Sequence, residues 1–226
     1  MAEVATVEAP ETLRRVARLD TPTRWSEISP VDASSSRSGN RYDVLGGGVL
    51  YCASETFTCY AETLARFRPS PAMRDLLSGH DRDEEHFMVV GGVPRDWRLR
   101  RRVFELRLST PLPFLDIEDM GTLTVLEREM SSVLVSLGYE GNVDIADVRN
   151  KDRQLSRSIA RWAYVAQSDL GEPLYSGIRY LSRVDPTGEC WAVFDGTEVD
   201  VVAEHVIDAT DQDLLRLVQA WDVRLF

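Results

Sequence analysis

Apolar residues recur about every two residues in some segments of the chain and about every 3.6 residues in others. Short segments rich in Val, Leu and Phe, bounded by Gly or Pro, predict strands at 49–53, 86–93, 102–109, 113–117, 178–182, 190–194 and 199–206. Apolar residues that recur at helical spacing predict helices at 54–67, 122–137, 152–167 and 211–220. Strands and helices are interspersed without a regular strand–helix–strand alternation. We therefore expect a single-domain α+β fold in which helices flank a mixed or antiparallel sheet.

The first twenty residues lack this patterning, because acidic residues surround isolated Val and Ala. This predicts a flexible leader over 1–20 and a folded domain over 21–226. The leader has no basic start followed by an apolar run, which argues against a signal peptide. No window approaches the roughly 18 consecutive apolar residues of a membrane span. We expect a cytoplasmic protein that does not enter a membrane.

Charge narrows the partners of this 226-residue chain. Lys and Arg total 26 against 37 for Asp and Glu, a net charge of -11. This acidic balance argues against direct binding of nucleic acid through a general basic surface. The one Lys is Lys151, so nearly every cationic contact must use a guanidinium, which suits bidentate phosphate binding. The arginines from Arg95 to Arg102 are interpreted as the solvated entrance of a strand, with anion binding as the alternative.

Cysteine and histidine spacing gives no support for metal chemistry. The chain has three residues of each type: Cys52, Cys59, Cys190, His80, His86 and His205. Neither CxxC nor HExxH is present, so we expect buried free thiols and no metal site. The glycines at 46–48 precede a strand, whereas phosphate loops follow a strand and open a helix. A flexible turn is therefore the preferred interpretation of these glycines.

Three separated segments carry a more informative pattern. They read Gly-Asn-Arg-Tyr-Asp at 39–43, Tyr-Cys-Ala at 51–53 leading to Tyr-Ala-Glu-Thr-Leu at 60–64, and Gly-Ile-Arg-Tyr-Leu-Ser-Arg at 177–183. At these residues the chain resembles the RES-domain family, many members of which are toxins that destroy NAD. Ile-Ala-Arg-Trp at 159–162 and Cys-Trp-Ala-Val-Phe at 190–194 extend the resemblance. It implies a fold related to ADP-ribosyltransferases and, for a toxin, a helix-turn-helix antitoxin partner that covers the NAD site.

The resemblance places Arg41, Tyr51, Glu62 and Ser182 at the positions of the family's Arg, strand Tyr, helix Glu and Ser. One segment departs from the pattern, because many toxins have Gly-Gly-Arg-Trp-Asn where this chain has Gly-Asn-Arg-Tyr-Asp. That variant is associated with a broader branch of the family, and it bears on the toxin role more than on the chemistry. Without the resemblance, Glu62 would be a solvated helix residue, Tyr51 a core residue, and Arg41 and Ser182 surface or turn residues.

The chemistry of these residue types fits cleavage of the nicotinamide–ribose bond. Positive charge develops on the ribose, as in glycoside cleavage, and the fixed carboxylate of Glu62 would stabilise it. Arg41 would hold the pyrophosphate of NAD. Tyr51 would stack on the nicotinamide, and Ser182 would hydrogen-bond the ribose or the amide. NAD is thus the expected substrate, without a further cofactor, and the acceptor is water or phosphate.

Two other functions remain open from the sequence. The chain could transfer ADP-ribose to a protein or small-molecule acceptor, which would leave label from NAD on that acceptor. It could also be a non-catalytic module that binds a nucleotide or a partner protein. Such a module would gain thermal stability from NAD without releasing nicotinamide.

Overall fold

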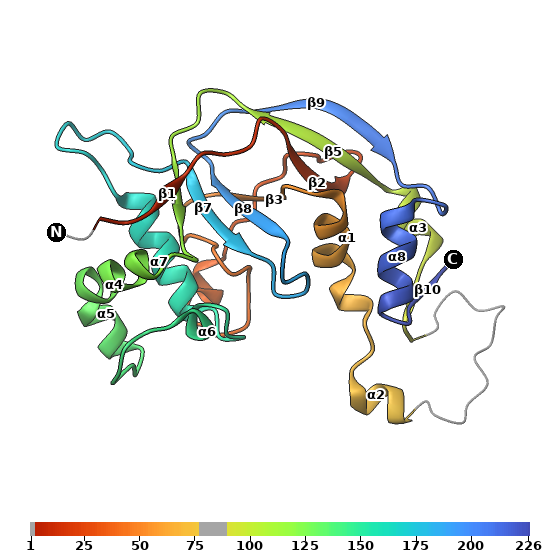
Figure 1. Ribbon diagram of the computed structural model, residues 1–226, viewed down its shortest axis with the longest axis horizontal. Helices are drawn as coiled ribbons and strands as arrows, with labels where there is room; N and C mark the ends of the chain where they lie inside the picture. Colours follow the sequence, from red (N-terminus) through yellow and green to blue (C-terminus); the bar gives the residue numbers. More distant parts are fainter. Residues whose placement is uncertain (1–2, 77–89) are drawn as a thin grey trace.

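A twisted eight-stranded sheet forms the centre of the computed structural model, which describes residues 3–76 and 90–226 (Figure 1). Its strands lie in the order β1-β6-β7-β8-β3-β2-β5-β9, and every neighbouring pair is antiparallel except β6 and β7. Their bounds are β1 Thr6–Val7, β2 Leu13–Arg18, β3 Val49–Ala53, β5 Arg101–Leu108, β6 Phe114–Asp116, β7 Gly177–Leu181, β8 Glu189–Phe194 and β9 Val199–Val206. The hairpin of β7 and β8 joins β6 on one side to β3 on the other. A separate parallel pair combines β4 Gly92–Val93 with β10 Arg224–Leu225.

The helices gather in two groups at opposite ends of the sheet (Figure 1). One group comprises α4 Met120–Glu129, α5 Ser131–Ser136, α6 Ile145–Val148 and α7 Gln154–Val165. The other comprises α1 Thr56–Leu64, α3 Arg95–Leu99 and α8 Gln212–Ala220. Shorter elements are α2 Pro71–Leu76 and the 3-10 turns η1 Pro30–Asp32 and η2 Ala65–Phe67. No described helix has the length and apolar character required to cross a bilayer.

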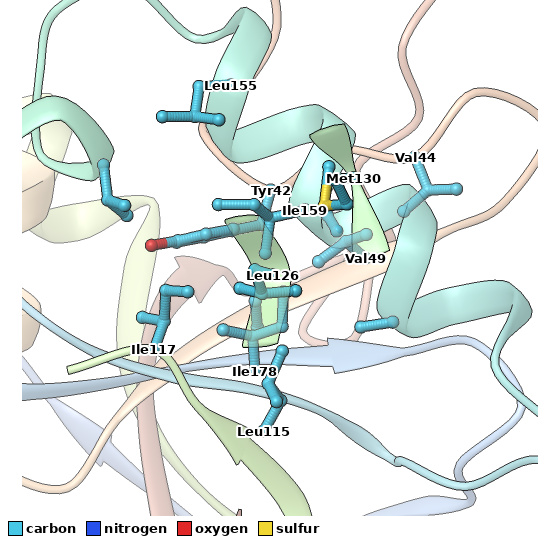
Figure 2. Packing of buried hydrophobic residues seen from close by; sticks show 14 of the residues in the cluster. Tyr42, Val44, Val49, Leu115, Ile117, Leu126, Met130, Leu155, Ile159 and Ile178 are labelled. Atoms are coloured by element: carbon cyan, nitrogen blue, oxygen red, sulfur yellow. The ribbon is translucent and has the colours of Figure 1, made fainter. Parts of the chain in front are cut away.

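Each helical group buries its own apolar face. In the α4–α7 group, Ile159 of α7 and Leu126 of α4 pack with Leu115 and Ile178 of the sheet around the ring of Tyr42 (Figure 2). Helical spacing explains the contribution of α7, whose buried apolar residues are Leu155, Ile159, Ala160 and Ala163. In the other group, α1 packs on α8 through a cluster that contains Tyr60, Leu64, Leu214 and Leu217. Both helices lie on the same face of the central strands, because Val49 and Ala192 pack with α7 whereas Ala53 and Cys190, on that same face of β3 and β8, pack with Cys59 of α1.

The expected α+β fold, with a mixed sheet and flanking helices, is confirmed. The flexible leader over 1–20 is wrong for residues 13–18, which form β2 between β3 and β5. All six residues of β2 pair with β5, and Leu13 is fully buried. Residues 6–7 add the short strand β1. The sequence pattern did not predict β2, because three arginines interrupt its apolar positions and acidic residues surround it.

Two further elements differ from the sequence pattern. The helix expected over 122–137 is split at Met130, which ends α4 and begins α5 and is itself buried. The arginines from Arg95 to Arg102 form α3 and the start of β5 rather than only a strand entrance. Two of these arginines contact side chains of α3: Arg100 pairs with Asp96, and Arg101 lies over the ring of Trp97. The strand expected over 86–93 lies largely outside the described residues, and its last two residues form β4.

Candidate functional site

Glu62 lies on the face of α1 that meets the β7–β8 hairpin. Thr58 and Glu62 are four residues apart, so both side chains leave the same face of the helix. The Thr58 hydroxyl donates to Oδ2 of Asp185 at 2.6 Å, and Oγ of Ser182 donates to Oε1 of Glu62 at 2.6 Å. Because these two bonds attach the hairpin loop to α1, they fix the direction of the Glu62 carboxylate.

The Ser182 hydroxyl is directed at Glu62. The side chain of Ser182 is buried, with 2% exposed, and its Oγ also accepts hydrogen bonds from the amides of Val184 at 3.1 Å and Asp185 at 3.0 Å. The hydroxyl therefore has three protein partners and is directed at the carboxylate. Ser182 is not among the residues that line the adjacent cleft. We assign it a positioning role, and the predicted hydrogen bond from Ser182 to a bound ribose stays a prediction.

Tyr51 presents its ring to the cleft and turns its hydroxyl away. The hydroxyl donates to Oδ1 of Asp43 at 2.9 Å and accepts from the amide of Tyr42 at 3.0 Å. Asp43 is itself buried and accepts from the amide of Asn40. Burial, followed by the Asp43 charge, raises the pKa of Tyr51 well above its ordinary value. The site thus contains a neutral aromatic ring, held between β3 and the 40–43 segment.

Arg41 lines the same cleft and is half-buried. Its Nη1 donates to the carbonyl of Val148 at 2.7 Å, and its Nη2 donates to the carbonyl of Arg149 at 3.4 Å. These carbonyls belong to the C-terminal end of α6, where a cation is favoured. Part of the guanidinium is therefore used to hold the 40–43 segment against α6. The remaining N–H groups are available to a ligand, and the predicted contact with a pyrophosphate stays a prediction.

The cleft has a volume of about 880 Å³ and lies between α1, strand β3, residues 24–27 and the start of α7. Six arginines and two glutamates contribute to its walls: Arg15, Arg24, Arg41, Arg66, Arg153, Arg183, Glu27 and Glu62. Within residues 3–76 and 90–226, none of these arginines forms an ion pair with a carboxylate. The cleft is therefore locally cationic in a chain whose net charge is -11.

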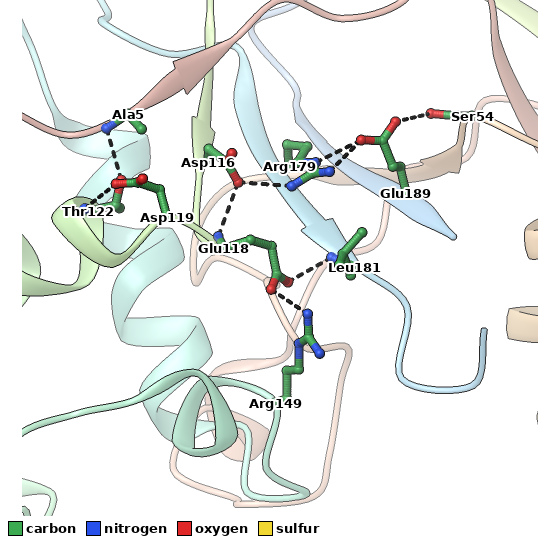
Figure 3. Close-up of polar contacts among 10 residues, drawn as sticks. All are labelled: Ala5, Ser54, Asp116, Glu118, Asp119, Thr122, Arg149, Arg179, Leu181 and Glu189. Atoms are coloured by element: carbon green, nitrogen blue, oxygen red, sulfur yellow. Dashed lines mark hydrogen bonds and ion pairs between the residues drawn. The ribbon is translucent and has the colours of Figure 1, made fainter. Parts of the chain in front are cut away.

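Glu118 connects the two walls that carry Arg41 and Ser182 (Figure 3). Its Oε1 accepts from the amide of Leu181 at 2.8 Å, and its Oε2 pairs with Arg149. Leu181 directly precedes Ser182, and the Arg149 carbonyl accepts from Arg41. One partly buried carboxylate thus holds the end of β7 and the end of α6 in a fixed relation.

A second ionic group stabilises the strands behind the cleft. Arg179 of β7 pairs with Asp116 of β6 at 3.2 Å and also with Glu189 of β8 (Figure 3). The Ser54 hydroxyl, just before α1, donates to Glu189 at 3.2 Å and accepts from the indole N–H of Trp191 at 2.9 Å. These contacts fix where the hairpin and the start of α1 meet.

The three cysteines are free and buried, as predicted, and all three line the cleft. Burial raises the pKa of the Cys52 thiol to about 12 and raises the pKa values of Cys59 and Cys190 above their ordinary range. The thiols are therefore protonated at neutral pH and serve as apolar packing. Among the residues that the structure describes, no group of three or more His, Cys, Asp or Glu side chains is arranged to hold a metal ion.

The structure brings Arg41, Tyr51 and Glu62 into one cleft, with Ser182 in contact with Glu62. The sequence interpretation missed several other wall residues: Arg15, Arg24, Arg66, Arg153, Tyr180 and Arg183. Tyr180 and Arg183 stand inside the quoted segment 177–183, so their positions beside Ser182 were a usable signal. Arg15 had none, because it belongs to a strand that the pattern assigned to a leader.

Comparisons with known proteins agree with the resemblance seen in the sequence. No curated protein gives a significant match. A crystal structure of the M. tuberculosis MbcT–MbcA toxin–antitoxin complex contains a chain that is 12% identical, with 89% of this chain and 86% of that chain covered and a TM-score of 0.48. The RES domain family model matches residues 12–218, which include all the cleft arginines. Because that match spans most of the sequence, this chain belongs to the RES-domain family.

Proposed function

We propose that this protein degrades NAD by cleaving the bond between nicotinamide and ribose. The observation that carries the proposal is the Glu62 carboxylate, fixed by Ser182 at the wall of a cleft whose arginines form no ion pair with any carboxylate of the described residues. As the C1′–N bond breaks, its electron pair leaves with nicotinamide and positive charge develops on the ribose. A carboxylate already aimed at that charge stabilises the transition state without reorganisation.

The cationic wall supports the proposal on the phosphate side. Arg41, Arg153 and Arg183 line the same cleft. Partial burial, then the charge of Arg41, and also that of Arg153, lower the pKa of Arg183. The positive charges of these guanidiniums repel one another, and a bound anion would relieve that repulsion. A pyrophosphate offers two negative charges and oxygens spaced for bidentate contacts. Glu62 lines the same cleft as Arg183, and its negative charge acts to raise the pKa of Arg183.

The aromatic wall suits the nicotinamide. Tyr51 and Tyr180 both line the cleft, and Tyr180 stacks at a tilt on Tyr42 with ring centroids 4.7 Å apart. Since the Tyr51 hydroxyl is held by Asp43, its ring cannot easily rotate away. The nicotinamide of NAD is a cation, which an aromatic face attracts. A ring fixed in this way would hold the leaving group in line with Glu62.

The decisive experiment measures nicotinamide released from NAD by the purified chain. Glu62→Gln keeps an oxygen that accepts from Ser182 but removes the charge, so we expect release to fall by about 100-fold or more while the thermal midpoint stays nearly constant. Glu55→Gln is the matched control, because Glu55 is exposed at the start of the same helix and has no capping hydrogen bond. Equal rates for the two variants, or no release by folded wild-type protein, would contradict the proposal.

Product analysis separates the possible acceptors. With water as acceptor the product is ADP-ribose, and with inorganic phosphate it is ADP-ribose 1″-phosphate. Transfer to a protein or small molecule leaves label from NAD on that acceptor. NAD-dependent thermal stabilisation without nicotinamide release would instead identify a binding module.

A toxin role is part of the proposal, because RES-family membership supports it. In the cytoplasm the chain would deplete NAD until a helix-turn-helix partner covered the cleft. Growth arrest on expression, absent for Glu62→Gln and reversed by co-expression of such a partner, is the expected result.

A further inference from the structure

The cleft holds more positive charge than the pyrophosphate of NAD requires. Elsewhere in the described chain, seven arginines pair with carboxylates: Arg74, Arg100, Arg107, Arg128, Arg149, Arg179 and Arg216. The six cleft arginines outnumber the two cleft glutamates by four. A pyrophosphate supplies about two negative charges and the nicotinamide adds one positive charge. A bound NAD molecule would therefore leave the cleft with an excess of guanidinium charge.

The excess is concentrated in a second group of arginines, distinct from Arg41, Arg153 and Arg183. Arg15 donates from Nη1 to the Tyr51 carbonyl at 2.6 Å and from Nη2 to the Arg24 carbonyl at 3.2 Å. Its Nε is buried without a hydrogen-bond partner. The exposed side chain of Arg24 forms no hydrogen bond or ion pair with the described residues.

Arg15 thus contributes a guanidinium held by two backbone carbonyls, and Arg24, whose carbonyl is one of them, contributes an exposed side chain to the same cleft. The carbonyl contacts hold Arg15 in place, so little conformational entropy is lost when a ligand binds. Trp25 follows Arg24 and also lines the cleft, which adds a flat indole surface next to the two cations. A purine stacks on such a surface, and a phosphate attached to its ribose would lie beside the arginines.

We propose that Arg15 and Arg24 bind a third phosphate, and that the substrate class is a nicotinamide dinucleotide with a phosphate monoester on its adenosine ribose, as in NADP. A phosphate monoester carries about -1.5 to -2 charges at pH 7 and three acceptor oxygens, so it would offset much of the positive charge that remains after NAD binds. The turnover of such a dinucleotide rests on the proposed function, whereas its binding does not. Free inorganic phosphate has the same chemistry and is the alternative source of the anion.

The test is calorimetric titration of the Glu62→Gln variant, in which turnover is suppressed. At low salt we expect NADP to bind about 10-fold or more tightly than NAD, and the ratio to shrink as salt screens the exposed guanidinium. Arg24→Gln should abolish the preference and leave NAD affinity within about two-fold. Arg107→Gln, which removes an arginine paired with Glu11 outside the cleft, should preserve it. Arg24→Lys, which keeps the charge without the planar fork, should retain part of the preference.

Equal affinities for NAD and NADP would overturn the proposal, as would an Arg24→Gln variant that loses both ligands equally. Inorganic phosphate is titrated alone in a parallel arm. Phosphate binding that depends on Arg24, together with equal dinucleotide affinities, would assign the subsite to free phosphate and also overturn the dinucleotide. Failure of the proposed function has a different signature: wild-type protein would release no nicotinamide from either dinucleotide, while the affinity ratio and its dependence on Arg24 would persist.

Discussion

The hydrogen bond between Ser182 and Glu62 allows a quantitative prediction. Ser182→Ala removes the 2.6 Å charge-assisted bond to Glu62 and leaves the amides of Val184 and Asp185 without their acceptor. With about 1 kcal/mol for each neutral bond and about 1.5 kcal/mol for the bond to the partly solvated carboxylate, the free energy of unfolding should fall by about 3 to 4 kcal/mol. Glu62→Ala removes one of these bonds and should cost about 1.5 kcal/mol.

A double-mutant cycle measured by urea denaturation isolates the shared bond. The double variant should cost about the same as Ser182→Ala alone, which gives a coupling free energy of about 1.5 kcal/mol. In thermal unfolding, Ser182→Ala should lower the midpoint by roughly 6 to 16 °C for a domain of this size. Ser136→Ala is the control, because its hydroxyl contacts only the Val133 carbonyl within its own helix. A coupling below about 0.3 kcal/mol between positions 182 and 62 would refute the positioning role of Ser182.

Three further predictions follow from packing, the ionic network and the thiols. Gly177→Ala should lower the free energy of unfolding by about 3 kcal/mol, because an added Cβ would lie 2.1 Å from the Ala192 carbonyl oxygen; Gly141→Ala, with nothing within 4 Å, should change it by less than about 0.5 kcal/mol in the same denaturation assay. Equal costs would contradict the close approach. Glu118→Gln, which weakens the ion pair with Arg149, should reduce nicotinamide release by about 10-fold with a small change in thermal midpoint. The control Glu129→Gln, on the exposed side of α4, should leave release unchanged. A loss of release explained wholly by unfolding would argue against a role of Glu118 in positioning the cleft walls. The three buried thiols should resist Ellman's reagent at pH 8 until urea unfolds the chain, since the thiolate reacts and the Cys52 pKa is raised to about 12. Because unfolded thiols ionise near pH 8.5, the free energy of unfolding should also decline as pH rises above about 8.5. Rapid labelling of the native chain would contradict both statements.

Much of the fold was predictable because most strands and helices repeat their apolar positions at a clear period. The strand at 190–194 is a continuous apolar segment and all five residues are buried, whereas the helix at 154–165 buries the face that its apolar spacing predicts. The strand β2 was not predictable, because it carries three arginines, one of which, Arg15, lines a cleft that exists only in the folded chain. Arg15 resembles a solvent-facing residue in the sequence, yet in the structure it donates to the carbonyl of Tyr51 from the neighbouring strand.

The residues of the candidate site could be selected from the sequence, but the contacts that fix their side chains could not. The resemblance selected Arg41, Tyr51, Glu62 and Ser182, and the structure places all four in or against one cleft. The bonds that fix them involve partners far along the chain, such as Val148 for Arg41. Sequence spacing carries no information on such partners, so it did not reveal that the Ser182 hydroxyl is directed at Glu62.

The position of the β7–β8 hairpin affects how the protein is made in the cell. Strands β3, β2 and β5 are synthesised earlier and can pair with one another, as can β1 and β6, but the sheet joins only when β7 and β8 insert between these two parts. The same hairpin brings Ser182 and Arg183 to α1. A nascent chain still on the ribosome before residue 194 has left the exit tunnel therefore lacks a complete cleft. The proposed activity would therefore appear only after this hairpin has been made, and chains truncated before residue 177 would lack it whatever else they fold into.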